Sequence, residues 1–190
     1  MKYIDFISFS IPDSRKIVKY MIRQNYSHLG IRLSGEDFIH HFYKKILKGT
    51  EDNIGNLYCV VKRKYISEEE YNCMLKYIKS LENRDYRYVS KKSLVLSFIM
   101  MAISNTPLRN LNRYLLNFQL KEDIHNCTSI WMLGLKESNI TFSEEESRRL
   151  GISLAMSWKY GSVKSIVESN LETVFKGTAR DYLREMQSED

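Results

Sequence analysis

Apolar residues recur at helical spacing after three serines of this chain, Ser34, Ser90 and Ser162. In each case apolar side chains stand four, five, twelve and thirteen positions after the serine. These offsets fall on one face of a helix with about 3.6 residues per turn, and serine is a favourable N-cap. Fifteen positions on, a Gly or Asn can take the left-handed conformation that ends a helix. The pattern therefore predicts helices over residues 34–49, 90–105 and 162–177.

A second helix signal precedes each of these segments. The three stretches are PDSRKIVKYMIRQ near Pro12, SEEEYNCMLKYIKSL from Ser67 and SEEESRRLGISLAMSW from Ser143. Proline suits the first turn of a helix, and acidic residues after a serine cap favour the positive end of the helix dipole. Three pairs of consecutive helices are therefore expected.

A short stretch with strand-like alternation precedes each helix pair. YIDFISFSI places Ser8 and Ser10 opposite its apolar side. LYCVVKRKY places Lys62 and Lys64 opposite Cys and Val, although Arg63 interrupts the apolar side. SIWMLGLK alternates in the same way, and a period of two is typical of a strand with one buried face. The sequence predicts strands over residues 5–11, 58–65 and 130–136.

The order strand, helix, helix thus occurs three times. A lone strand cannot satisfy its backbone groups, and a unit of about 50 residues is too small for a core of its own. The expected fold is therefore mainly α with short β-strands, in three tandem βαα units whose strands pair. The predicted divisions are unit one at 1–50, unit two at 56–105, a linker at 106–127, unit three at 128–177 and an acidic tail at 178–190.

This order resembles the ribbon-helix-helix DNA-binding proteins. The resemblance is carried by FISFSIPDSRKIVKYMI with LSGEDFIHHFYKKIL, by VVKRKYISEEEYNCMLKYI with VSKKSLVLSFIMMAI, and by MLGLKESNITFSEEESRRLGISL with GSVKSIVESNLETVF. Several copies in one chain are similar to the accessory DNA-processing proteins of conjugative transfer. The resemblance implies a ribbon of paired strands in the major groove, with helix starts at the phosphates.

The resemblance also implies roles for individual residues. The base-reading side chains would be Ser8, Ser10, Lys62, Lys64 and Lys136. The phosphate-binding residues would be Ser34, Ser90, Lys91, Lys92, Ser162 and Lys164.

Charge is unevenly spread along the chain, whose net charge is +6. Residues 1–50 hold nine Lys/Arg against four Asp/Glu, a net +5, and residues 51–105 hold nine against seven, a net +2. Residues 128–177 balance, with six of each. Because neutralised phosphates supply much of the affinity for DNA, units one and two are the better DNA-binding candidates. Unit three either contacts DNA or serves only folding or dimerisation.

The expected function is sequence-specific binding of double-stranded DNA, either as an accessory, relaxosome-type protein of conjugative transfer or as a plasmid or phage transcriptional regulator. Three units leave one ribbon to pair outside the chain, so a homodimer is expected. A relaxase or another transfer protein is a candidate partner. The alternative is a helical protein–protein interaction module, such as a viral or phage adaptor, in which the positive charge is incidental.

Other functional signals are weak. The chain has no phosphate loop, paired-histidine metal motif or nucleophile elbow, so no enzyme, cofactor or metal is expected. The adjacent His40 and His41 are expected to be solvated. The aromatic residues Tyr3, Tyr58, Tyr65 and Trp131 are expected in the core or an interface rather than as platforms for bases.

The expected location is cytoplasmic, with no membrane contact. The three cysteines are widely spaced, which suits reduced thiols. No secretion signal is evident, and the longest apolar run, over residues 94–103, is too short to span a bilayer.

Overall fold

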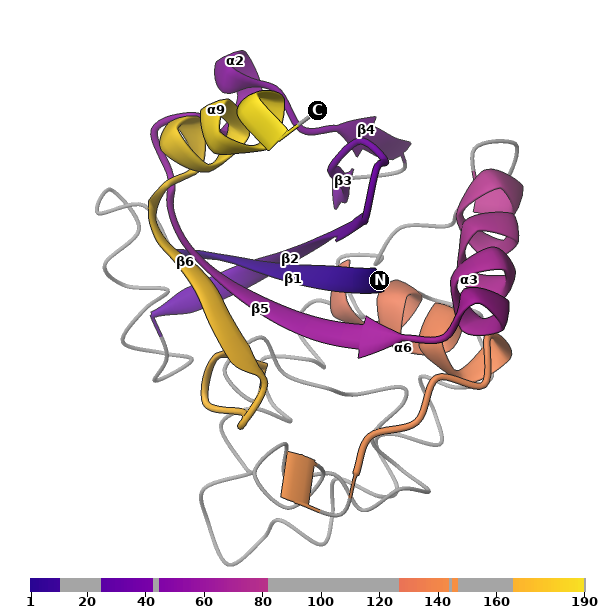
Figure 1. Ribbon diagram of the computed structural model, residues 1–190. Coiled ribbons are helices and arrows are strands. Elements are labelled where there is room, and N and C mark those ends of the chain that lie inside the picture. The colour runs from indigo at the N-terminus through magenta and orange to yellow at the C-terminus, as the bar shows by residue number, and fades with distance from the viewer. Residues whose placement is uncertain (11–24, 43–44, 82–126, 144, 147–165, 190) are drawn as a thin grey trace, which may run out of the picture.

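The computed structural model describes residues 1–10, 25–42, 45–81, 127–143, 145–146 and 166–189 (Figure 1). This part of the chain holds six strands and four helices. The strands are β1 (Lys2–Ser10), β2 (Tyr26–Leu33), β3 (Ile39–Phe42), β4 (Lys45–Lys48), β5 (Tyr58–Ile66) and β6 (Glu172–Thr178). The helices are α2 (Glu51–Ile54), α3 (Glu68–Leu81), α6 (Cys127–Glu137) and α9 (Ala179–Glu189).

All six strands form one antiparallel sheet in the order β4-β3-β2-β1-β5-β6. The two longest strands, β1 and β5, are neighbours inside the sheet and pair from Lys2 opposite Ile66 to Phe9 opposite Cys59. The sheet therefore joins the beginning of the chain to residues near its end, because β6 pairs with β5.

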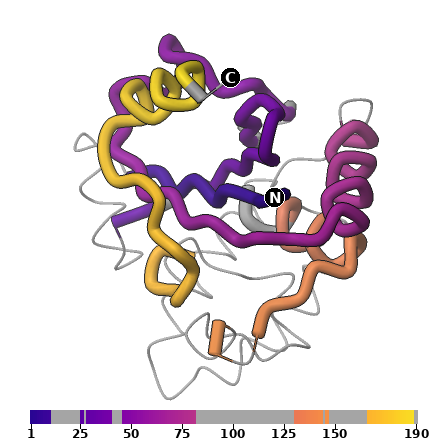
Figure 2. The backbone as a smooth tube through the Cα atoms, in the orientation of Figure 1, coloured from indigo at the N-terminus to yellow at the C-terminus, as the bar shows by residue number. Residues whose placement is uncertain are grey.

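Both faces of the central strand β1 are buried, so the sheet lies between two layers. Ile4 and Phe6 point into one core, with apolar residues of α3 and α6. Ile7 and Phe9 point into the other, with Ile54 of α2 and apolar residues of α9. Figure 2 shows α2 and α9 together on one side of the central strands, while α6 lies on the other side.

The expectation of a mainly α protein built of three βαα units is wrong, because the chain forms an α/β fold around a six-stranded sheet. Two of the three predicted strands are confirmed, with β1 at 2–10 and β5 at 58–66. They pair with each other, and each has a further strand on its outer side, β2 and β6. The helix predicted from Ser67 is also confirmed as α3.

The strand predicted over 130–136 is a helix, α6. The alternation of residue types in this stretch wrongly indicated a strand. Ile130, Trp131, Met132 and Leu135 are all fully buried, so the hydrophobic pattern over these positions does not show the helical period. The indole nitrogen of Trp131 donates a hydrogen bond to the Leu29 carbonyl of β2 at 3.0 Å, which fixes α6 against the sheet.

The helix predicted over 34–49 is wrong as well, since the described residues of this range form a turn and the paired strands β3 and β4. The Phe38 side chain fills the space that a Cβ would take at Gly30 and at Gly49, so both glycines serve close packing. The Gly49 N–H donates to the Phe38 carbonyl at 2.9 Å and closes the hairpin. The helix predicted over 162–177 is likewise wrong at its end, where β6 lies.

Several other predictions fall outside the described residues. They are the first helix of unit one, the helix over 90–105, the linker over 106–127 and most of the helix from Ser143. The residues predicted as an acidic tail include α9, which packs on the sheet through Ala179, Tyr182 and Leu183. Among the described helices, none has the length and apolar character needed to cross a membrane.

His40, expected to be solvated, is instead buried beside a second histidine. Its Nδ1 lies 3.0 Å from Nε2 of His28, so one of these nitrogens donates a hydrogen bond to the other. The ring of Phe38 stacks on His40 and Phe9 lies against His28. Burial lowers the pKa of His28 to about 4, and burial together with the neighbouring His28 lowers the pKa of His40 to about 4.

We expect the histidine pair to make folding sensitive to mild acid. Between the ordinary histidine pKa of about 6.5 and the folded value of about 4, the unfolded chain binds more protons than the folded chain. The contribution of the neutral histidines to the free energy of unfolding is therefore fully present above about pH 6.5 and is lost as the pH falls toward 4. For His28 this loss is roughly 3 kcal/mol. Urea unfolding at several pH values measures this loss.

The matched control is the double variant His28→Gln, His40→Gln, which has no imidazole to protonate. Its free energy of unfolding should fall less than that of the unchanged protein between pH 6.5 and 4.5. Parallel pH profiles for the two proteins would show that the histidine pair does not couple folding to pH.

Candidate functional site

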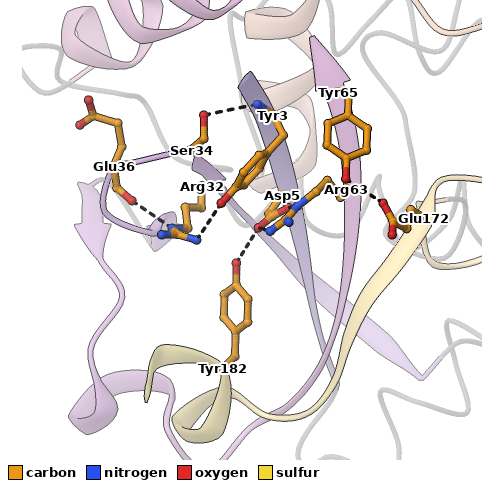
Figure 3. Close-up of polar contacts among 9 residues, drawn as sticks. All are labelled: Tyr3, Asp5, Arg32, Ser34, Glu36, Arg63, Tyr65, Glu172 and Tyr182. Carbon is orange, nitrogen blue, oxygen red and sulfur yellow. Dashed lines mark hydrogen bonds and ion pairs between the residues drawn. The ribbon is translucent and has the colours of Figure 1, made fainter. Parts of the chain in front are cut away.

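Polar side chains gather at one end of the sheet, on the face that also carries α9 (Figure 3). Sheet register explains the arrangement, because directly opposite residues point to the same face. Asp5 of β1 lies opposite Arg32 of β2 and opposite Arg63 of β5. One step nearer the chain start, Tyr3 lies opposite Tyr65.

The carboxylate of Asp5 is fully buried and is the centre of this cluster. Arg63 donates two hydrogen bonds to it, at 2.7 Å from Nε and 2.8 Å from a terminal nitrogen. The hydroxyl of Tyr182, on α9, donates a third at 2.9 Å. The bonds to Asp5 raise the pKa of Arg63 above its ordinary value, and burial followed by the Asp5 charge raises the pKa of Tyr182.

Arg63 and Arg32 hold the ring of Tyr3 in place. The guanidinium of Arg63 lies over the ring, 3.6 Å from its centroid. Arg32 donates to the Tyr3 hydroxyl at 3.4 Å and to the Glu36 carbonyl at 3.2 Å. The backbone N–H of Tyr3 donates to Oγ of Ser34 at 3.3 Å. Tyr3 is therefore restrained at its backbone, its ring face and its hydroxyl.

Tyr65 packs against Tyr3 and is exposed to solvent. The two ring centroids lie 6.5 Å apart with the planes at 82°, an edge-to-face contact. The Tyr65 hydroxyl donates to the Glu172 carboxylate at 3.1 Å. With 47% of its surface exposed, Tyr65 is among the few large hydrophobic residues in the described part of the chain that face solvent. We call Tyr3 and Tyr65 the tyrosine pair.

The charged groups of the cluster are occupied by one another. The Asp5 carboxylate already accepts three hydrogen bonds, and the Arg63 guanidinium is committed to it. In the part of the chain that the structure describes, no three His, Cys, Asp or Glu side chains lie close enough to hold a metal ion. Burial raises the pKa of the Cys59 thiol to about 12, which leaves it a poor nucleophile. The tyrosine pair, beside the carboxylate of Glu172, is the part of the cluster that is open to a ligand.

The predicted base-reading residues lie apart from this cluster. Ser8 and Lys62 point to the opposite face of the sheet, where both are buried. Lys64 is on that face too and pairs with Glu146 at 3.2 Å. Ser10 is half-buried at the end of β1, and Lys136 is exposed in the last turn of α6.

One predicted phosphate-binding residue is described. Ser34 caps no helix; it lies in the turn after β2, where its hydroxyl accepts the bond from Tyr3. The remaining predicted anchors are outside the described residues, namely Ser90, Lys91, Lys92, Ser162 and Lys164.

Sequence reasoning missed the cluster, although one signal was present. Arg63 interrupts the apolar side of its strand, and Asp5 does the same in the first strand. Charged residues on the inward sides of two strands indicate a buried pair if the strands are neighbours. Only the pairing of β1 with β5, 58 residues apart at this point, brings the two charges together.

Comparison of this chain with protein-family models, with curated proteins and with solved structures found no match. The similarity to ribbon-helix-helix proteins in short sequence stretches therefore gains no support from these comparisons.

We predict that Asp5→Asn strongly destabilises the fold. The change leaves the Arg63 guanidinium without its counter-charge in a mostly buried position, which costs roughly 3 kcal/mol or more in the free energy of unfolding. Tyr182→Phe removes one hydrogen bond and no charge, and should cost only about 1 kcal/mol. Urea unfolding of both variants measures the difference. Equal midpoints for Asp5→Asn and the unchanged protein would contradict a central role for this ion pair.

Proposed function

We propose that this protein binds single-stranded nucleic acid, with bases stacked on the tyrosine pair. The observation that carries the proposal is the position of Tyr3 and Tyr65 on adjacent interior strands of an antiparallel sheet, edge to face and partly open to solvent. Aromatic side chains in such positions stack bases irrespective of sequence, because each base presents a π-face.

The rigidity of the tyrosine pair supports this proposal. Binding costs the conformational entropy of every side chain that must be ordered, so a surface fixed in advance binds more tightly. Tyr3 is fixed by Arg32, Arg63 and Ser34, and Tyr65 is fixed by Tyr3 and Glu172. Burying the Asp5–Arg63 pair carries a desolvation cost that hydrophobic residues would avoid. This cost is consistent with an ion pair whose role is to orient the aromatic surface rather than to add stability.

Charge supports an anionic ligand and also orients it. The whole chain carries +6, which attracts polyanions and speeds their encounter. The exposed carboxylate of Glu172 beside Tyr65 repels phosphate locally, so the sugar–phosphate backbone has to pass on another side of the rings. Glu172 can instead accept a hydrogen bond from the amino group of a stacked base.

The double-stranded DNA expected from the sequence is the less favoured ligand. A major groove admits a two-stranded ribbon, but β1 and β5 have β2 and β6 on their outer edges. Bases in a duplex are also stacked on each other and cannot cover Tyr65. A role in conjugative transfer or transcriptional regulation, a homodimer and a relaxase partner stay predictions, and all are compatible with single-strand binding.

Replacing Tyr65 tests the proposal. Tyr65→Ala should weaken binding of a labelled single-stranded oligonucleotide of about 12 nucleotides by roughly 1–3 kcal/mol, or about 5- to 150-fold, because one stacked base loses its platform. Tyr65→Phe should bind nearly as the unchanged protein does, since stacking needs the ring and not the hydroxyl. Fluorescence anisotropy across a salt series measures the affinity.

Tyr58 offers a matched control on the same strand. It is 45% exposed, close to the value for Tyr65, but an odd separation places it on the opposite face of the sheet. Tyr58→Ala should therefore leave binding unchanged. Equal affinity of the Tyr65→Ala and unchanged proteins would remove the tyrosine pair from the site. Tighter binding of a duplex would support the double-stranded reading, and no binding of either at low salt would support a protein interaction module.

A further inference from the structure

A buried lysine without a counter-charge lies on the other face of the sheet. Lys62 of β5 is only 7% exposed. Its ammonium donates to the backbone carbonyls of Ser169 and Leu171, at 3.1 Å each. Within the described residues no carboxylate pairs with it. An ammonium has three donors, so two carbonyl bonds leave one donor unused and the charge unneutralised.

A buried hydroxyl lies on the same face. Ser8 is fully buried, and its Oγ makes no hydrogen bond within the part of the chain that the structure describes. In the register Ser8 lies opposite Val60, two residues from Lys62, and Ser8 and Lys62 therefore share a face as diagonal neighbours. A buried polar group left unsatisfied costs roughly 1–3 kcal/mol, and such groups are rare in native proteins.

A second lysine completes the group. Lys176 of the edge strand β6 lies opposite Val60, in line with Ser8 across three strands. It is exposed to solvent. Burial lowers the pKa of Lys62, and the charge of Lys176 lowers it further, so the two ammonium groups repel each other. Two like charges on one face, with no ion pair to an acidic side chain among the described residues, favour an anion.

We infer that Lys62, Lys176 and Ser8 form a site for an anion of the phosphate class on the face of the sheet opposite the tyrosine pair. A phosphate oxygen is an acceptor that suits each of these donors, namely the unused Lys62 donor, the Lys176 ammonium and the Ser8 hydroxyl. Its charge compensates for the buried cation, which the described protein groups do not. The phosphate belongs either to a small molecule or to a nucleic-acid backbone.

Titration with inorganic phosphate at constant ionic strength tests this site by isothermal calorimetry. The unchanged protein should show saturable binding. Lys176→Gln, at an exposed position that leaves the fold intact, should bind about tenfold more weakly, because one charge-assisted contact is lost. Lys62→Met should abolish saturable binding. Lys136→Gln, a change of the exposed lysine on α6, is the control and should bind as the unchanged protein does.

Failure of the site would be plain in this experiment. No saturable binding by the unchanged protein, or equal affinity for the unchanged and Lys176→Gln proteins, would overturn the inference. If Lys62→Met does not fold, Lys176→Gln still decides. Tyr65→Ala should bind phosphate normally, so loss of the proposed base stacking and loss of this site are distinguishable.

A competition experiment then identifies the source of the phosphate. Displacement of a bound oligonucleotide by inorganic phosphate, together with weaker oligonucleotide binding by Lys176→Gln, would assign the site to the nucleic-acid backbone. Phosphate binding without displacement would assign it to a small phosphorylated molecule. Both results require the anion site itself.

Discussion

The fold depends on one buried carboxylate. Asp5 lies in the central strand of the sheet and accepts hydrogen bonds from Arg63 of β5 and Tyr182 of α9, residues 58 and 177 positions further along the chain. A charge without solvent needs such partners, because an unpaired buried carboxylate would cost several kcal/mol. Strand pairing and the docking of the last helix are thus coupled through a single side chain.

The same interaction determines what the sheet offers to a ligand. Asp5 accepts two hydrogen bonds from the guanidinium of Arg63 and so fixes its orientation. In this orientation the guanidinium lies over the ring of Tyr3. Tyr3 in turn supports the edge of Tyr65, which projects beyond the part of the sheet that α9 covers. A buried ion pair is a weak source of net stability but a strong source of geometric specificity in this arrangement.

Local sequence signals predicted the elements whose causes are local. Alternation predicted β1 and β5, and the serine cap with acidic residues predicted α3, where Ser67 and Glu70 bond each other's backbone N–H groups. The same signals failed where tertiary packing decides. In α6 the consecutive residues Ile130, Trp131 and Met132 are all buried, and the β3–β4 hairpin depends on Phe38 filling the space above two glycines. The candidate site was not predictable for a related reason, because its central ion pair joins β1 and β5 and its third hydrogen bond comes from α9, and no local pattern reveals either contact.

The two faces of the sheet at β5 suit different ligands. Three cations follow one another there, and each meets a different environment. Arg63 faces α9 and has the Asp5 carboxylate. Lys64 faces the other way and has Glu146. Lys62 shares the face of Lys64, but among the described residues it bonds only backbone carbonyls, with the Ser8 hydroxyl and a second lysine as neighbours on that face. The carboxylate of Asp5 lets Arg63 shape an aromatic surface, whereas Lys62, which has no carboxylate among the described residues, suits a bound anion that compensates its charge.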